Sequence, residues 1–280
     1  MLFVWIRPDA QKSCGESAPG GILKSLAYHC PDTWRLPPGV CHPASYFDDV
    51  KARFEALSYE VFIRTLPSIG QAGASWADDR DAVIEMIEPH MDHGTEFVVI
   101  GHSYGGMPAV GVCEDRSIAE RQAAGKRGGI RAVIFVGSAL VLDRGQTALD
   151  AFGGVYPPWL PFENDGKDGL LHPKIDLAKE ALYNDLDDVV ASRLAGGLLP
   201  HSVASLTSIQ TYAGENLQIP AFYMVCEEDN TVPPWLQHSI CDGGRVRGMR
   251  KLTCATGHCP MFKNPKGFVK QIDECVRGDI

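Results

Sequence analysis

The stretch EFVVIGHSYGGM, residues 96–107, decides which fold the chain is expected to adopt. A run of β-branched and aromatic residues ends at Gly101, and small residues follow Ser103 in an order that suits a helix. This is the G-x-S-x-G pattern, in which a buried strand turns sharply into a helix and presents the serine at the apex. Bulky residues at positions 101 and 105 would collide with the strained turn. The alternative is a tight glycine turn with an incidental serine, but the strand and helix around it favour a nucleophile.

The composition is that of an ordinary globular protein. The chain has 280 residues, of which 45% are hydrophobic and 22% charged, enough for one large domain or two modest ones. Its net charge of −9, without a dense block of lysine or arginine, argues against binding to nucleic acid. Nine scattered cysteines in a chain of this size are typical of reduced thiols in a cytoplasmic protein.

Membrane association is not expected from the sequence. The apolar residues 1–6 are too few for a signal-peptide core, and Arg7 follows directly. No run approaches the roughly 20 apolar residues of a membrane span. We therefore expect a cytoplasmic protein, and the sequence leaves its oligomeric state open.

Helix-like and strand-like segments alternate on both sides of the opening stretch. Residues 47–57 and 78–91 carry apolar side chains at helical spacing, whereas residues 60–64 and 131–136 have the composition of strands. Residues 1–6 could supply a further core strand. This alternation predicts an α/β fold with a mostly parallel central sheet and helices on both faces.

The alternation stops between residues 143 and 219. Prolines in residues 155–162 would remove hydrogen-bond donors from a sheet, and residues 178–199 are typical of one or two helices. We expect a helical cap at 143–219, inserted after the strand that follows the elbow helix. Residues 1–142 and 220–280 then form the core, with an irregular N-terminal segment at 8–37. Core-type strands and helices resume at 220–226, 233–240, 250–254 and 265–276.

A serine hydroxyl is a weak nucleophile until a base, itself oriented by an acid, takes its proton. In proteins with this kind of elbow the chain order is serine, acid, histidine. Asp229 follows the strand at 220–226, and His258 follows the strand at 250–254. The C-terminal ends of parallel strands are where such sheets carry their sites. The order therefore predicts a triad of Ser103, His258 and Asp229.

Other acids and histidines are alternatives for these roles. Asp143, which follows the strand after the elbow helix, is the main alternative for the acid, and Glu227 and Glu228 precede Asp229 directly. Among the histidines, only His258 both follows the acid strand and lies in a loop next to a strand end. His102 belongs to the elbow, and we expect its side chain to point away from the nucleophile.

The chemistry of a serine nucleophile also needs two backbone N–H groups for the oxyanion. One is expected from Tyr104, directly after Ser103. The other is expected from Val40, in the turn PGVC at residues 38–41. The alternative for this turn is a proline–glycine bend without a catalytic role.

The remaining candidate features are less specific. Tyr156, Trp159 and Phe162 could line a substrate pocket or form the core of the expected cap. Cys254 and Cys259 lie close to His258 in sequence, but this spacing matches no usual zinc pattern. No glycine-rich phosphate loop follows a strand. We expect neither a metal nor a cofactor.

These motifs resemble those of the α/β-hydrolase fold superfamily. The closer resemblance is to the small capped hydrolases related to plant esterases and hydroxynitrile lyases, with fungal and bacterial relatives. It covers about residues 38–276 and implies an acid at Asp229 rather than Asp143. It is carried by PGVCHP at 38–43, LPSIG at 66–70, GHSYGG at 101–106, CEED at 226–229 and GHCP at 257–260, with YNDL at 183–186 and PHS at 200–202 similar to fungal relatives.

Two departures from this family pattern limit what the resemblance implies. Relatives begin with an apolar strand that runs straight into the Pro-Gly loop, whereas residues 8–37 intervene here. Hydroxynitrile lyases of the family carry a lysine directly after the catalytic histidine, and it stabilises the cyanide-bearing intermediate. This chain has Cys259 at that position, which argues against lyase activity of that kind.

We therefore expect a serine hydrolase that cleaves a small or medium carboxylic ester, lactone or thioester through an acyl-enzyme. Its expected partner is a small-molecule acyl substrate. A carbon–carbon bond hydrolase or lyase on the same triad is one alternative, because the family that this chain resembles includes both. A non-catalytic small-molecule-binding protein of the same fold is another, and the presence of Ser103, Asp229 and His258 together argues against it.

Overall fold

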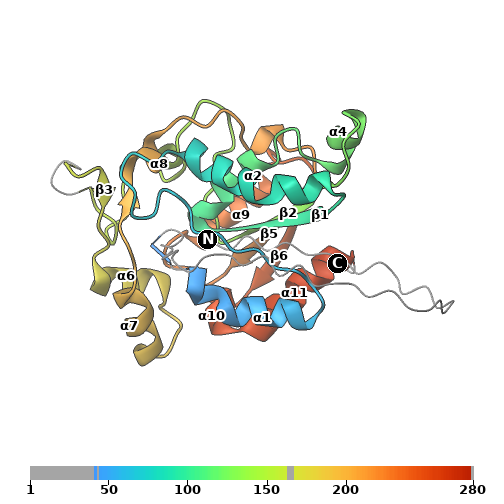
Figure 1. Cartoon of the computed structure of the whole chain (residues 1–280). Coiled ribbons are helices and arrows are strands. Elements are labelled where there is room, and N and C mark those ends of the chain that lie inside the picture. The colour runs from blue at the N-terminus through green and yellow to red at the C-terminus, as the bar shows by residue number, and fades with distance from the viewer. Residues whose placement is uncertain (1–40, 43, 163–166, 279–280) are drawn as a thin grey trace, which may run out of the picture.

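The structure is a computed structural model that describes residues 41–42, 44–162 and 167–278 (Figure 1). The expectations for residues 1–6, for residues 8–37 and for Val40 fall outside the described residues. Within the described part, strands and helices alternate along the chain, as a parallel sheet requires.

Four strands of the described chain form a parallel sheet at the centre of the molecule. Neighbouring strands follow the order β1-β2-β5-β6. Because the strands are parallel, the loops that follow their C-terminal ends meet at one edge of the sheet. The strands are β1 (Glu96–His102), β2 (Gly129–Val136), β5 (Ala221–Cys226) and β6 (Arg250–Cys254).

The sequences of the strands explain their places in the sheet. Every residue of β5 is buried, and β1 is buried from Phe97 to His102. Near-continuous apolar runs of this kind belong to parallel strands that helices cover on both faces. By contrast, β6 has exposed residues and ends the described sheet.

Helices cover both faces of the sheet. In Figure 1, α2 (Trp76–Asp92) lies above the sheet, and α1 (Asp48–Ala56) and α11 (Pro265–Arg277) lie below it. The elbow helix α3 (Gly106–Val112) packs against α2 and against β1 and β2. The other elements of this part are η1 (Ala44–Phe47), η2 (Ser103–Gly105), α4 (Ile118–Ala123), α9 (Pro234–Asp242) and α10 (Pro260–Lys263).

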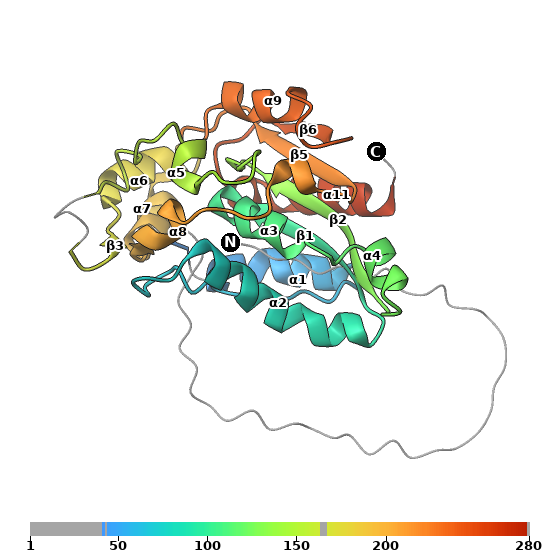
Figure 2. The same ribbon diagram turned by 90° about the horizontal axis from the view of Figure 1, so that it is seen from above.

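Residues 143–219 lie between β2 and β5 in the chain. Figure 2 shows α6 (Ile175–Leu182) and α7 (Asp188–Gly196) at one end of the central sheet. Asn184 Nδ2 donates to the Glu228 carbonyl at 2.9 Å, and Thr231 Oγ1 donates to the Ala181 carbonyl at 2.8 Å, so α6 contacts the loop after β5. The elements are α5 (Ala148–Ala151), β3 (Leu170–Leu171), α6 (Ile175–Leu182), α7 (Asp188–Gly196), β4 (His201–Ser202), α8 (Val203–Thr207) and η4 (Gly214–Asn216).

One expected element does not form. Residues 60–64 alternate like a strand, but they have no regular secondary structure, because no strand among the described residues pairs with them. The helix expected at 78–91 is slightly longer and begins at Trp76. Its start is fixed by Ser75, whose hydroxyl accepts the Asp78 N–H in a reciprocal capping box.

Candidate active site

The turn after β1 has the backbone of a strained elbow. Ser103 has a φ of +56°, a left-handed conformation that is uncommon for a residue with a side chain. A Cβ atom at Gly101 would lie 2.7 Å from the Gly105 carbonyl oxygen, and one at Gly106 would lie 2.7 Å from Ser138 Oγ. Larger residues at positions 101 and 106 would therefore force the turn apart.

The Asp229 carboxylate lies in the loop after β5 and is held by three donors of that loop and of α9. Its Oδ1 accepts hydrogen bonds from the backbone N–H groups of Thr231 at 2.7 Å and Val232 at 3.0 Å. Its Oδ2 accepts from Gln237 Nε2 at 2.9 Å. The carboxylate is buried, so these donors replace the water that its charge would otherwise need.

His258 is in direct contact with this acid. Its Nδ1 lies 2.8 Å from Asp229 Oδ2, and both side chains are fully buried. A carboxylate at Nδ1 fixes the tautomer that carries its proton there, which leaves a lone pair on Nε2. Among the described residues, His258 Nε2 has no hydrogen-bond partner. An imidazole held in this way can take a proton from a hydroxyl group.

Gly137, directly after β2, leaves space for the Asp229–His258 pair. It has a φ of +49°, and a Cβ atom there would lie 3.1 Å from Asp229 Oδ2 and 3.6 Å from His258 Nδ1. Both the backbone conformation and the short contact therefore favour glycine at this position. The sequence pattern alone did not indicate this role.

His102 contacts the loop of the base rather than the serine side chain. Its Nε2–H donates to the His258 carbonyl oxygen at 2.8 Å, and the two ring centroids are 4.7 Å apart. Burial lowers the pKa of His102 well below its usual value, and the nearby rings of His258 and His42 add to this shift. The ring is therefore neutral and serves as a fixed donor.

His42 extends this group of rings toward residues 143–219. Its ring centroid is 6.3 Å from that of His102, edge to face. Its Nε2 lies 2.6 Å from the hydroxyl of Tyr183, the residue directly after α6. His42 also follows Cys41, whose φ is +59°. The chain directly after the predicted second oxyanion donor is thus held in a defined turn.

The structure brings Asp229 and His258 together, and Ser103 directly follows a residue that contacts the loop of His258. Ser103 follows His102, the residue that contacts the His258 loop, and only 9% of Ser103 is exposed. Because His258 Nε2 has no partner among the described residues, it forms no hydrogen bond with Ser103 Oγ in this structure. Tyr104 follows in η2 and is buried.

The alternative acid, Asp143, has a different partner. Its carboxylate pairs with Arg245 at 2.9 Å, while His258 Nδ1 is occupied by Asp229.

The three aromatic candidates of the expected pocket differ in their surroundings. Trp159 is buried, whereas Tyr156 and Phe162 stack on each other with ring centroids 5.3 Å apart, and 43% of Phe162 is exposed.

The loop that carries His258 is held by the link between α6 and α7. Asp185 Oδ2 accepts the Gly257 N–H at 2.7 Å, and Lys263 donates to the Asp185 carbonyl oxygen. A Cβ atom at Gly257 would lie 2.4 Å from Asn184 Oδ1. The loop after β6 therefore fits closely against residues 143–219.

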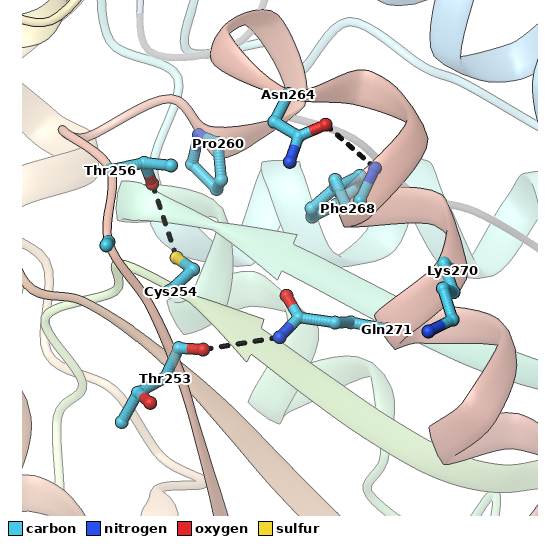
Figure 3. A pocket seen from close by; sticks show the side chains of 10 residues that line it. Thr253, Cys254, Thr256, Pro260, Asn264, Phe268, Lys270 and Gln271 are labelled. Atoms are coloured by element: carbon cyan, nitrogen blue, oxygen red, sulfur yellow. Dashed lines mark hydrogen bonds between the residues drawn. The ribbon is translucent and has the colours of Figure 1, made fainter.

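A surface pocket of about 410 Å³ lies on the other side of this loop (Figure 3). It is lined by the end of β6, including Cys254, and by α11, including Phe268 and Gln271. Gln271 Nε2 donates across it to the Thr253 carbonyl oxygen at 3.2 Å. None of the three predicted catalytic residues lines this pocket, so it is separate from the candidate site.

The described part of the chain has neither a metal-type cluster of side chains nor a membrane-spanning helix. No three side chains of His, Cys, Asp or Glu gather there in the way that metal ligands would. No helix in that part is long and apolar enough to cross a membrane. The seven cysteines that the structure describes are all free thiols.

Comparison with known proteins gives consistent matches along most of the chain. The model of the alpha/beta hydrolase family matches residues 27–271. A probable hydrolase, R7, from Phoma sp. is 30% identical over 240 residues, which cover 82% of this chain and 92% of that protein. The alpha/beta hydrolase nvfD from Aspergillus novofumigatus is 25% identical over 242 residues, which cover 84% and 92% of the two chains.

A solved structure of polyneuridine aldehyde esterase is similar in fold. It matches with a TM-score of 0.67 at 17% sequence identity and covers 86% of this chain and 97% of its own. At this identity the likeness shows the fold alone. The family model spans most of the chain, and the described sheet agrees with the fold of this structure, as the sequence motifs predict. This chain belongs to the alpha/beta hydrolase family.

Proposed function

We propose that the chain is a serine hydrolase that cleaves a small or medium carboxylic ester, lactone or thioester through an acyl-enzyme on Ser103. His258 is the general base and acid, and Asp229 orients it. Backbone N–H groups of Tyr104 and Val40 stabilise the oxyanion. Neither a metal nor a cofactor takes part in this proposal.

The observation that carries the proposal is the buried pair of His258 and Asp229. The 2.8 Å contact at Nδ1 holds the imidazole in one tautomer, and Nε2 is buried without a partner among the described residues. What distinguishes this nitrogen is that its ring is paired with a buried carboxylate at Nδ1, so its lone pair is available as a base. A base that awaits a hydroxyl proton accounts for this arrangement.

The strained backbone at Ser103 supports the same assignment. Its φ is +56°, and the chain packs closely around Gly101 and Gly106 on either side of it. Residues held in such conformations occur preferentially at active sites, where the strain positions a reacting group. The short helix α3 begins at Gly106, whose N–H donates back to the Ser103 carbonyl oxygen and so closes the turn.

The proposed reaction has two halves. Ser103 Oγ attacks the acyl carbonyl while His258 Nε2 takes its proton, and the carbonyl oxygen gains negative charge opposite the backbone N–H groups. The carbon–oxygen or carbon–sulfur bond to the leaving group breaks as Nε2 returns the proton to it. Water then attacks the acyl-enzyme with the same proton transfers, which releases the acid and restores Ser103.

We also propose that residues 143–219 form a cap over this site. The hydrogen bonds of Asn184 and Asp185 with the loops after β5 and β6 support this placement. Trp159, Tyr156 and Phe162 of this segment are the proposed apolar surface for the substrate. Polyneuridine aldehyde esterase, of similar fold, is an esterase by name, which agrees with an ester as the substrate class.

Labelling with a fluorophosphonate probe tests the proposal directly. The probe forms a covalent bond only with an activated serine, so we expect stoichiometric labelling that is lost in Ser103→Ala. The matched control is Ser239→Ala, a helix serine whose hydroxyl donates to the Leu236 carbonyl. This control should label like the unchanged chain.

The outcomes separate the possible functions. Absence of labelling, or labelling that persists in Ser103→Ala, would contradict the serine hydrolase and favour a non-catalytic binding protein. A third outcome is a labelled chain that hydrolyses no acyl ester, short or long, but cleaves a ketone or a 1,3-dicarbonyl compound. This result would favour a carbon–carbon bond hydrolase or lyase on the same triad.

A further inference from the structure

Tyr104 is anchored to helix α2 by a buried hydrogen bond. Its side chain is buried, and its hydroxyl donates to Asp79 Oδ2 at 2.7 Å. Burial raises the pKa of Tyr104 well above its usual value, and the nearby Asp79 carboxylate adds to this shift. The phenol therefore keeps its proton and remains the donor.

Asp79 is an unexpected residue for its position in α2. It is fully buried, yet it forms no ion pair with any described residue. Its hydrogen-bond donors are the Tyr104 hydroxyl and the Ser68 N–H, the latter 2.8 Å from Oδ1. A buried carboxylate without a cation costs more than an amide or an apolar side chain at the same place. The adjacent Asp78 already closes the capping box of the helix, so the start of α2 does not require Asp79.

Tyr104 and Asp79 lie where α2, the elbow and β4 meet. The Ser68 carbonyl accepts the Ser202 N–H of β4 at 2.6 Å. Ser68, whose N–H donates to Asp79, therefore also contacts residues 143–219. The ring of His201 in β4 lies edge-on to Tyr104, with centroids 4.9 Å apart. The Tyr104 side chain is therefore enclosed by α2, by the elbow and by β4.

We propose that Asp79 is a positioning residue, which fixes the direction of the Tyr104 backbone N–H by holding the Tyr104 hydroxyl. The inference rests on the proposed function, in which that N–H stabilises the oxyanion. Tyr104 directly follows the strained Ser103, so a small rotation at residue 104 would redirect both the amide and the nucleophile. Asp79 acts through Tyr104 and does not touch the substrate.

Three variants separate this role from a merely structural one. Tyr104→Phe keeps the ring and the backbone amide but removes the donor, Asp79→Asn keeps the shape but removes the charge, and the third variant combines both. The matched control is Asp78→Asn, which removes the neighbouring acid and weakens the helix cap without a link to the elbow. Each chain is assayed with p-nitrophenyl acetate, labelled with a fluorophosphonate and melted thermally.

We expect kcat and the labelling rate constant to fall about tenfold in each single variant with KM little changed, because the lost stabilisation belongs to the transition state. The double variant should lose no more than the worse single variant, because Asp79→Asn weakens and Tyr104→Phe removes the same contact. Asp78→Asn should lower the melting temperature but keep kcat. If a general loss of stability in α2 were the cause, kcat would fall in Asp78→Asn as it does in Asp79→Asn.

The results that overturn the inference are distinct from those that overturn the proposed function. If the unchanged chain is not labelled, the proposed function fails and the inference fails with it. If the unchanged chain is labelled but Tyr104→Phe and Asp79→Asn keep its kcat, only the inference fails. Should Asp79→Asn not fold, Tyr104→Phe decides alone, because it leaves no unfilled volume beyond one hydroxyl group.

Discussion

Gln237 Nε2 donates to Asp229 Oδ2 at 2.9 Å, and this oxygen also receives His258 Nδ1–H at 2.8 Å. Gln237 is fully buried in α9 and is itself fixed at both ends of its amide. Its Oε1 accepts the Cys226 N–H at 2.9 Å, and its Nε2 also donates to the Val232 carbonyl at 2.6 Å. One side chain thus joins the end of β5 to the loop of the proposed acid.

We predict that Gln237→Leu lowers kcat about tenfold, because Asp229 loses a fixed donor and no longer holds His258 in one orientation. The melting temperature should also fall, since the Cys226 N–H is left buried without a partner. Initial rates with an ester substrate check the first effect. Ser239→Ala on the exposed side of the same helix is the control and should keep kcat. An unchanged kcat in Gln237→Leu would show that the loop holds Asp229 without it.

Gly137→Ala should damage activity more than stability. A new Cβ atom would lie 3.1 Å from Asp229 Oδ2, so the carboxylate must move away from its place beside His258. Gly153→Ala is the matched control, because Gly153 also has a positive φ, +79°, but has open space around its Cβ direction. Both variants should lose about 1 kcal/mol of stability from the backbone conformation. Only Gly137→Ala should lose kcat, and equal activity of the two variants would contradict the role of the short contact.

The elements nearest the elbow could be predicted from the sequence because their residues carry strong local patterns. The buried run of β1, the apolar face of α2 and the amphipathic α11 all follow from side-chain periodicity, whereas the start of α2 at Ser75 was not predicted. The triad of Ser103, Asp229 and His258 was predicted from the chain order typical of such elbows, and of these three the structure places Asp229 and His258 in contact. Residues 60–64 were predicted wrongly, because a strand depends on a neighbour as well as on its own alternation.

The supporting residues of the candidate site could not be predicted in this way. Gln237 and Asp79 each lie on a helix whose sequence gives no reason to assign them a special role. Their contacts with Asp229 and Tyr104 cross between elements, and only the packed structure brings them together. His102 was considered only in relation to Ser103, whereas its contact is with the backbone of a loop 156 residues later.

We expect Asp185→Ala to impair His258, the proposed base, through the neighbouring Gly257. The variant removes the acceptor of the Gly257 N–H and loosens the loop that carries His258. We expect kcat to fall several-fold and the fluorophosphonate rate to fall with it, because the base is less well oriented. Asp187→Ala is the control, since Asp187 caps α7 and its loss should cost about 1 kcal/mol of stability at unchanged kcat. If both variants behave alike, the loop does not depend on Asp185.

The free energy of unfolding in acid should depend on Asp79 and His201, two buried titratable residues that contact Tyr104. Burial raises the pKa of Asp79 to about 6, above its value of 3.8 in the unfolded chain. As pH rises from about 4 to 6 the unfolded state loses this proton first, so Asp79 makes the folded state less stable with rising pH. Burial lowers the pKa of His201 to about 3 from 6.5. Over the same range the unfolded state binds this proton first, so His201 makes the folded state less stable with falling pH.

The two effects oppose each other between about pH 4 and 6, so removing one of them should expose the other. Asp79→Asn should lose stability more steeply on acidification, by up to about 1.4 kcal/mol per pH unit, and His201→Phe should lose it less steeply. Urea unfolding at a series of pH values measures both slopes. Asp78→Asn is the control, because Asp78 is exposed, and hydrogen bonds of Ser75 lower rather than raise its pKa. Parallel slopes in the unchanged chain and in Asp79→Asn would mean that Asp79 titrates alike in the folded and unfolded states, which would contradict the raised pKa.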